Sequence, residues 1–193
     1  MGLGYVGLPL CLEFVRAGYH VVGIDSDVAK IEALRNRTSY IPDISGNELA
    51  ESFNTGRFEL SSGPEAIATV DTLNVCVPTP LTVAGTPNLS FVNMALQSIE
   101  KHRRSGQLFI LESTTYPGTT EEVLLTALSK GGLEGGEDFF LAYSPERIDP
   151  GNPDYNTCNI PKVVGGVTQS CTDCAVALYG NCIENVVPVS SSR

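Results

Sequence analysis

The chain has 193 residues, of which 42% are hydrophobic and 18% charged, a composition typical of a globular protein of about one domain. Twelve basic and 22 acidic residues give a net charge of −10 at pH 7. This charge argues against sequence-independent binding to nucleic acid or anionic membranes. No apolar run approaches the roughly 20 residues of a membrane span, and no secretory signal is visible, so we expect a cytoplasmic protein with reduced thiols.

Apolar runs alternate with helical patterns along the chain, and turn residues separate them. After a glycine turn over 1–7, we predict helices over 8–17, 28–36, 47–54, 90–103, 119–130 and 168–179, and strands over 20–25, 73–77, 107–111, 139–143, 162–164 and 186–189. The expected helix caps are Asp27, Ser90, Thr119 or Thr120, and Thr168. Continuous apolar strands separated by helices predict an α/β fold, a doubly wound parallel sheet of the Rossmann type.

The chain opens on Gly2-Leu3-Gly4-Tyr5-Val6-Gly7, which fits the G-x-G-x-x-G pattern of dinucleotide-binding turns. In this pattern the first glycine makes a tight turn, the second lets the backbone approach a pyrophosphate, and the third allows close packing of helix and strand. The helix that follows offers free N–H groups and its positive dipole end to phosphates. The turn therefore indicates a phosphate-binding site.

Asp25 ends the next predicted strand, 18 positions after Gly7, close to where the fingerprint places its ribose-binding acid. A carboxylate there accepts hydrogen bonds from both ribose hydroxyls and repels a 2′-phosphate, so NAD is favoured over NADP. The alternative interpretation is a glycine-rich turn followed by an unrelated aspartate at a strand end.

The dinucleotide fingerprint requires a strand before its first glycine, and only Met1 precedes Gly2. That strand is central in a doubly wound sheet. We therefore expect that the chain is truncated at its N-terminus and lacks the first strand, which would leave a gap or a false edge beside the turn.

Five motifs, the first of which contains the glycine turn, narrow the class of protein. They are GLGYVGLPL (2–10), VCVPTPL (75–81), ESTTYPGTTEEV (112–123), YSPERIDPGN (143–152) and IPKVVGG (160–166). In these motifs and their order the chain resembles the UDP-sugar dehydrogenase family, most closely its UDP-N-acetylglucosamine 6-dehydrogenase branch. The resemblance implies that residues 1–193 form the NAD-binding domain, and that the central helix and the C-terminal UDP-binding domain are absent.

The resemblance also implies an activity, a cofactor and a partner. The family oxidises the C6 alcohol of a nucleotide sugar to a carboxylate with two NAD, in polysaccharide biosynthesis. The expected substrate is a UDP-N-acetylhexosamine, with UDP-N-acetylglucosamine favoured, and the full-length form is expected to be a homo-oligomer. The family's nucleophilic cysteine lies in a Gly-Gly-x-Cys motif, which is not present here because Gly165-Gly166 continues as Val167-Thr168. We therefore expect no turnover by this chain alone.

Site residues follow from the resemblance, position by position. The residues that match cofactor contacts are Gly2, Gly4, Tyr5, Val6, Gly7, Asp25, Lys30, Pro78, Thr79, Ser113 and Thr114. Thr114 matches the hydroxyl that orders the catalytic water or the oxyanion, and a hydroxyl suits this role because it both donates and accepts. Four of these residues also have a purely structural interpretation. Lys30 could be a solvated charge on a helix, and Pro78, Thr79 and Thr114 could merely end a strand.

Glu146 and Arg147 match the family's substrate loop. Glu146 is expected to hold the hydrolytic water as a general base, and Arg147 to contact a diphosphate or the sugar. The UDP-glucose branch carries a second glutamate four residues later, where this chain has Pro150 beside Asp149, so a role that needs that glutamate is not expected here. The plainer alternative for Glu146 and Arg147 is a surface ion pair.

Three other classes of protein fit parts of the sequence. An NAD-dependent dehydrogenase of the β-hydroxyacid type shares the glycine turn, and a non-enzymatic NAD-binding module needs no catalytic residues. Cys171 and Cys174 form a C-x-x-C pair that suits a zinc or redox module, with Cys158 and Cys182 the nearest further thiols. Because only one close pair exists, we expect no metal site.

Overall fold

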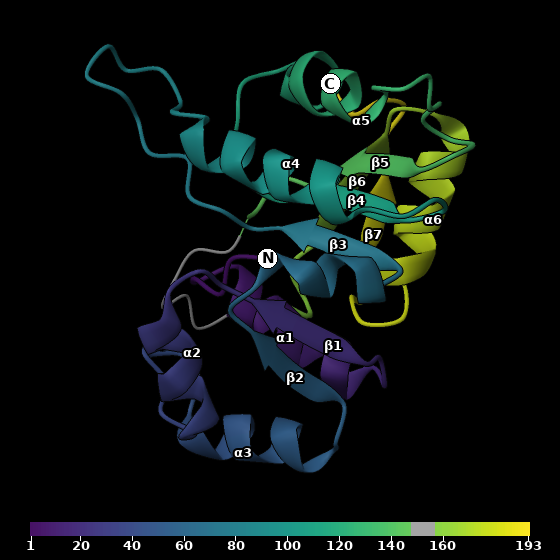
Figure 1. The fold of residues 1–193 in the computed structure, drawn as a ribbon. Helices are drawn as coiled ribbons and strands as arrows, with labels where there is room; N and C mark the ends of the chain where they lie inside the picture. Colours follow the sequence, from purple (N-terminus) through teal and green to yellow (C-terminus); the bar gives the residue numbers. More distant parts are fainter. Residues whose placement is uncertain (148–156) are drawn as a thin grey trace.

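The computed structural model describes residues 1–147 and 157–193. Its helices are α1 (Gly7–Arg16), α2 (Val28–Arg35), α3 (Gly46–Asn54), η1 (Pro64–Thr69), α4 (Ser90–His102), η2 (Thr120–Leu125), α5 (Thr126–Leu128) and α6 (Gln169–Tyr179). Its strands are β1 (Val21–Ile24), β2 (Phe58–Ser61), β3 (Thr72–Val75), β4 (Leu108–Leu111), β5 (Phe140–Tyr143), β6 (Lys162–Gly166) and β7 (Val186–Pro188). Each predicted helix and strand has an observed counterpart within a few residues of its expected position. The predicted Rossmann-like α/β class is confirmed (Figure 1).

The strands lie in two groups in the described residues. β1 pairs with β2 in parallel, and a five-stranded sheet follows in the order β3-β4-β5-β6-β7. Pairing in the larger sheet is parallel except between β5 and β6, which run antiparallel. The expectation of a wholly parallel sheet is therefore wrong at this pair. Parallel neighbours need a crossover, usually a helix, whereas antiparallel neighbours do not, and the predicted elements placed no helix between these two strands.

The first two residues join the two groups of strands. The N-terminal amine of Met1 donates to the Asn74 carbonyl at 2.8 Å, and the Cys76 amide donates back to the Met1 carbonyl at 2.8 Å. On the other side, the Gly2 amide donates to the Ile24 carbonyl at 2.8 Å. Met1 and Gly2 therefore lie between β1 and β3, where a doubly wound sheet has its central strand. This placement puts the glycine turn at the carboxyl ends of both strands (Figure 1).

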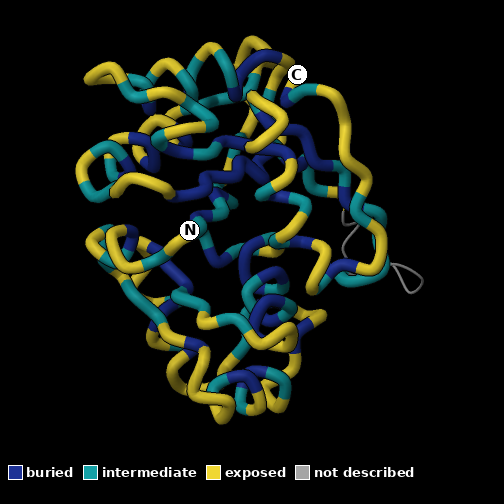
Figure 2. Tube along the Cα trace, turned by 90° about the vertical axis from the view of Figure 1, so that its right-hand side faces the viewer, coloured by how far each residue is buried: buried dark blue, intermediate teal, exposed yellow. Residues whose placement is uncertain are grey.

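Alternation along β4 builds a core on both sides of the larger sheet. Phe109 and Leu111 face one way and pack with α4 and η2, while Leu108 and Ile110 face the other way and pack with α1 and α6. A third cluster fills the space between β1, β2 and the helices α1, α2 and α3. The buried residues accordingly run through the middle of the trace, with exposed residues outside (Figure 2). Across the described ranges, no helix is both long and apolar enough to cross a membrane.

Two expected helix caps are correct and two are wrong. The Asp27 carboxylate accepts hydrogen bonds from the amides of residues 29 and 30, and the Thr168 hydroxyl accepts one from the Cys171 amide. Ser90 is the first residue of α4 rather than its cap: the N-cap position falls on Leu89, which has no capping side chain, and the Ser90 amide donates to the Asn88 side chain. The Thr119 hydroxyl donates to the Tyr116 carbonyl, and the segment it precedes is a π-helix that continues into α5.

β2 and η1 are the elements that the sequence pattern missed in the irregular stretch 37–70. β2 has four residues and only Phe58 of them is buried, so the strand is too short to show an alternation of apolar and polar residues in the sequence. It matters to the site because η1 follows it and forms one wall of the cavity described below.

Candidate functional site

Steric contacts make glycine necessary at two positions of the opening turn. Gly2 has a φ of +87°, and a Cβ there would lie 2.5 Å from the Cys76 carbonyl oxygen. A Cβ on Gly7 would overlap the Gly2 carbonyl, so the turn closes tightly on itself. Gly4 differs from both, because a Cβ there would meet nothing within 4 Å. Gly4 lines the cavity, and its missing side chain leaves the backbone open to a ligand.

In the part of the chain that the structure describes, the helix that follows the turn begins without a side-chain cap. α1 starts at Gly7 and buries Leu8 and Leu12 in the core. No side chain of the described residues caps its N-terminus at Val6. Uncapped N–H groups at a helix N-terminus, together with its dipole, are suited to an anion.

Asp25 follows β1 directly and lies against the glycine turn. Its Oδ2 accepts a hydrogen bond from the Leu3 amide at 2.8 Å, and its Oδ1 accepts one from the Asp27 amide at 2.9 Å. Lys30 Nζ lies 3.5 Å from Oδ2, and its side chain is 37% exposed. Asp25 as a residue is 8% exposed, so backbone donors hold its carboxylate at the wall of the cavity that it lines.

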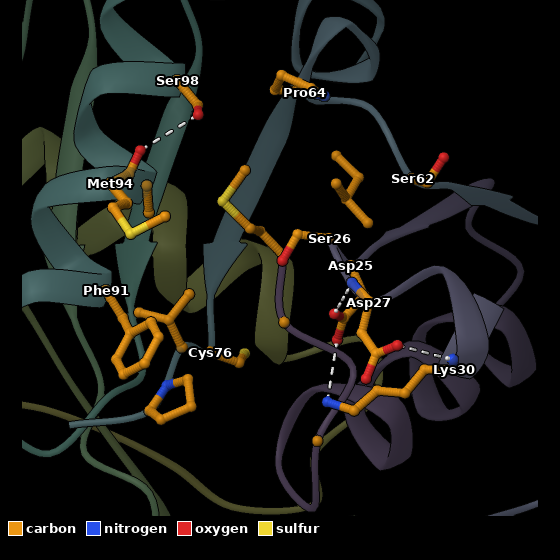
Figure 3. A pocket seen from close by; sticks show the side chains of 17 residues that line it. Asp25, Ser26, Asp27, Lys30, Ser62, Pro64, Cys76, Phe91, Met94 and Ser98 are labelled. Carbon is orange, nitrogen blue, oxygen red and sulfur yellow. Dashed lines mark hydrogen bonds and ion pairs between the residues drawn. The ribbon is translucent and has the colours of Figure 1, made fainter. Parts of the chain in front are cut away.

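A cavity of about 360 Å³ connects these groups to α4. It is lined by Met1, Gly2, Gly4, Ile24, Asp25, Ser26, Asp27, Lys30, Ser62, Pro64, Cys76, Val77, Pro78, Phe91, Met94, Ala95 and Ser98. Figure 3 shows Asp25, Asp27 and Lys30 on one side and the α4 side chains on the other, with Cys76 between them. One end of the cavity is therefore polar and borders the turn, and the other is largely apolar.

The cavity brings together five of the residues predicted to contact the cofactor: Gly2, Gly4, Asp25, Lys30 and Pro78. The others are not part of its lining. Tyr5, within the turn, is 53% exposed, Val6 is the N-cap of α1, and Gly7 is the first residue of that helix. Thr79, Ser113 and Thr114 lie at the ends of β3 and β4, described next.

The loops after β3 and β4 hold each other through hydroxyl groups. The Ser113 hydroxyl donates to the Val77 carbonyl at 2.6 Å, and the Thr79 hydroxyl donates to the Thr114 carbonyl at 2.6 Å. The Thr114 residue itself is exposed. The hydroxyls of two predicted cofactor contacts, Ser113 and Thr79, therefore connect the two loops. The Thr114 hydroxyl makes no hydrogen bond within residues 1–147 and 157–193.

Glu146 and Arg147 follow β5, the strand beside β4, so they come at the same edge of the sheet as Thr114. Glu146 is half-buried and accepts a hydrogen bond from the Arg147 amide at 2.7 Å, and Arg147 is exposed. Asp149 and Pro150, where this chain departs from the UDP-glucose branch, lie outside the described residues.

A closed polar network that the sequence did not indicate lies behind these loops. Glu112 is fully buried and its carboxylate accepts hydrogen bonds from the Lys162 ammonium at 2.8 Å, the Asn74 amide at 2.8 Å and the Tyr179 hydroxyl. Burial opposes the charge of Lys162, but Glu112 outweighs it and the pKa of the ammonium is raised. Burial, followed by the Glu112 charge, raises the pKa of Tyr179 well above its ordinary value.

The C-x-x-C pair is not arranged as a metal site. Cys171 is buried, and its sulfur accepts hydrogen bonds from the Leu141 amide at 3.2 Å and the Thr168 hydroxyl at 3.1 Å. Throughout residues 1–147 and 157–193, no group of three or more histidine, cysteine and acidic side chains is placed to hold a metal ion.

Sequence reasoning missed the cavity's far wall. Ser62 and Pro64 follow the unpredicted strand β2, so no pattern pointed to them. Phe91, Met94 and Ser98 lie at helical spacing on α4, and Phe91 and Met94 are 42% and 61% exposed. Two large apolar side chains beside the buried face of a predicted helix were a signal that could have found this wall.

The fold and the cavity together define a dinucleotide-binding domain of the Rossmann type, in which a glycine turn and a strand-end acid line one cavity and a helix begins directly after the turn. The particular family follows from comparison with known proteins. The model of the "UDP-glucose/GDP-mannose dehydrogenase family, NAD binding domain" matches residues 1–183, and the chain belongs to this family. NAD is its cofactor, and the family expected from the five sequence motifs is confirmed.

Relatives of known activity span more than this chain. A UDP-N-acetyl-D-glucosamine 6-dehydrogenase of Pseudomonas aeruginosa is 37% identical over 93% of the chain and 42% of its own length. A UDP-N-acetyl-D-mannosamine dehydrogenase of Pyrococcus horikoshii is 33% identical over 93% of the chain and 43% of its own length. The solved structure of a UDP-D-ManNAc dehydrogenase from the same archaeon has a TM-score of 0.91, with 30% identity over 99% of the chain and 46% of that protein. The chain therefore spans less than half of these relatives.

Proposed function

We propose that this chain is the NAD-binding part of a dehydrogenase that oxidises the C6 alcohol of a UDP-N-acetylhexosamine to the carboxylate with two NAD. The observation that carries the cofactor site in this proposal is the 2.8 Å hydrogen bond between Asp25 Oδ2 and the Leu3 amide, which holds the acid against the glycine turn. The names of the relatives support a UDP-N-acetylhexosamine, and the motif resemblance favours UDP-N-acetylglucosamine over the mannosamine form.

The residues of the cavity fit a dinucleotide. The backbone at Gly4, which no side chain covers, and the uncapped N-terminus of α1 would bind the pyrophosphate. Asp25 would accept hydrogen bonds from the adenosine ribose, and the apolar space beside Met94 and Pro64 would take the adenine ring. When bound, NAD supplies the nicotinamide that accepts hydride from the substrate.

The catalytic residues that the chain itself contributes are Thr114 and Glu146. An exposed hydroxyl at the end of β4 both donates and accepts, so Thr114 orients the reacting oxygen or the attacking water. Glu146 acts as a general base that holds this water, and Arg147, which is exposed, contacts the substrate diphosphate. The position of Glu146 after the neighbouring strand puts it at the same sheet edge as Thr114.

Calorimetry with NAD and NADP tests the cofactor site. We expect NAD to bind more tightly than NADP, because the Asp25 carboxylate repels a 2′-phosphate. Asp25→Asn should weaken NAD binding about ten- to a hundredfold, the value of a hydrogen bond to a charged group, and reduce the discrimination against NADP. Asp173→Asn, on the exposed face of α6, is the matched control and should bind both as the unmodified chain does. Equal affinity of the Asp25 variant and the unmodified chain for NAD would contradict the proposal.

Catalysis is tested separately from binding. The chain given NAD and UDP-N-acetylglucosamine is expected to form no NADH, because the family resemblance assigns the UDP-binding domain, as well as the nucleophilic cysteine of the second oxidation, to motifs that are not found among these residues. NADH formation above the level without sugar would show that this part of the proposal is wrong, and a UDP-N-acetylmannosamine arm would then separate the two sugars.

A further inference from the structure

Tyr40 reaches the glycine turn from a distant part of the chain. It lies between α2 and α3, outside every motif that carries the family resemblance. Its hydroxyl donates a hydrogen bond to the Leu3 carbonyl at 2.6 Å. Because Asp25 accepts from the Leu3 amide at 2.8 Å, both backbone polar groups of Leu3 are held by side chains, one by an acid and one by a phenol.

The bond at the Leu3 carbonyl fixes the next amide as well. The Leu3 carbonyl and the Gly4 N–H belong to one planar peptide, in which the two groups point in opposite directions. A donor at the carbonyl therefore sets the direction of the Gly4 N–H, and it also polarises the peptide so that the N–H becomes a better donor. Gly4 lines the cavity, and a Cβ there would meet nothing within 4 Å.

Tyr40 is held in place by packing and charge. Its ring packs against the core cluster of α1, α2 and α3, and the Lys30 ammonium lies 5.8 Å from the ring centroid. Burial raises the pKa of the Tyr40 hydroxyl, and the charge of Asp25 raises it further. The hydroxyl therefore stays protonated at neutral pH and remains a donor. Tyr40 is not part of the cavity lining, so it acts through the turn rather than on a ligand.

We propose that Tyr40 is a positioning residue for the dinucleotide diphosphate: its hydroxyl orients the Leu3–Gly4 peptide so that the Gly4 N–H faces the phosphates. This assignment rests on the proposed binding of the pyrophosphate at Gly4. It separates two parts of the ligand, because the diphosphate depends on the turn, whereas the adenosine depends on Asp25 and the α4 wall.

The test uses a series of ligands and two tyrosine variants of the chain. NAD, ADP and adenosine are titrated by calorimetry or amide NMR into the unmodified chain, Tyr40→Phe and Tyr19→Phe. Tyr40→Phe keeps the ring and the cation contact and removes only the hydroxyl. Tyr19→Phe is the matched control, since Tyr19 is also half-buried and donates to a backbone carbonyl, that of Leu178 at 3.4 Å, away from the turn.

We expect Tyr40→Phe to weaken NAD and ADP about three- to tenfold and to leave adenosine unchanged, whereas Tyr19→Phe binds all three normally. Without ligand, the Gly4 amide resonance of Tyr40→Phe should also shift relative to that of the unmodified chain. This shift reports a changed conformation of the turn independently of binding. Unchanged NAD binding, or an equal loss for adenosine, would overturn the assignment and leave Tyr40 a packing residue. If the unmodified chain bound adenosine but showed no gain from the diphosphate, the proposed phosphate site and the Tyr40 assignment would fall together, while the Asp25 site would stand.

Discussion

Asp25 and Glu112 are both buried carboxylates at the carboxyl ends of parallel strands, yet their surroundings differ. Asp25 lines a cavity and is held by backbone amides and a partly exposed lysine. Glu112 is 0% exposed, and a lysine, an asparagine and a tyrosine surround it. Position at a strand end therefore does not by itself define a binding acid. What defines it is whether lone pairs remain that face open space.

Breaking the closed network is expected to have the largest effect. Lys162→Met leaves the Glu112 carboxylate buried without its ion partner, which typically costs about 3–5 kcal/mol of unfolding free energy. The measurement is denaturant unfolding of the chain. The double variant that adds Glu112→Gln removes both charges and should recover most of this loss, because a buried pair as a whole contributes little. If Lys162→Met alone were as stable as the unmodified chain, the Glu112 carboxylate would have to be accessible to water rather than buried.

Removal of the Tyr179 hydroxyl is expected to have the next largest effect. Tyr179→Phe deprives the Glu112 carboxylate and the Asn74 amide of a buried partner, at a cost of about 1–3 kcal/mol. Tyr5→Phe, at a residue that is 53% exposed, is the control and should change stability little.

Two groups, the Tyr179 hydroxyl and the Cys11 thiol, are expected to make the stability of the chain depend on pH. Burial raises the pKa of Cys11 to about 11, and burial with Glu112 raises the pKa of Tyr179 further above its ordinary value. The folded chain therefore keeps protons that the unfolded chain releases, so stability is fully present below about pH 8.5 and falls as pH rises past the ordinary pKa values of cysteine and tyrosine. Unfolding free energies measured across this range should fall less steeply above about pH 10 in Tyr179→Phe. An equal slope in both proteins would contradict this role of Tyr179.

The two carboxylates also show how far the sequence could be interpreted. Asp25 was predictable because it follows a glycine turn at a fixed spacing, and the fold class followed from the alternation of apolar runs with helices. Glu112 lies within a recognised motif, but nothing local shows that Lys162 and Tyr179 approach it, since those contacts span 50 and 67 residues. Tyr40 was missed for the same reason, because its contact with Leu3 crosses 37 residues and depends on how α2 and α3 pack.

The smallest effect on stability is expected for Lys30, which lies beside Asp25 in the cavity. Lys30 lies 3.5 Å from Asp25, but its side chain is 37% exposed, so solvent screens the pair. Lys30→Met should therefore change the unfolding free energy by only about 0–1 kcal/mol, in contrast to the same substitution at the buried Lys162. If Lys30 also contacts the ribose, the variant should weaken NAD and adenosine alike, since both carry that sugar. A loss confined to NAD would instead connect Lys30 to the diphosphate, through its contact with the Tyr40 ring.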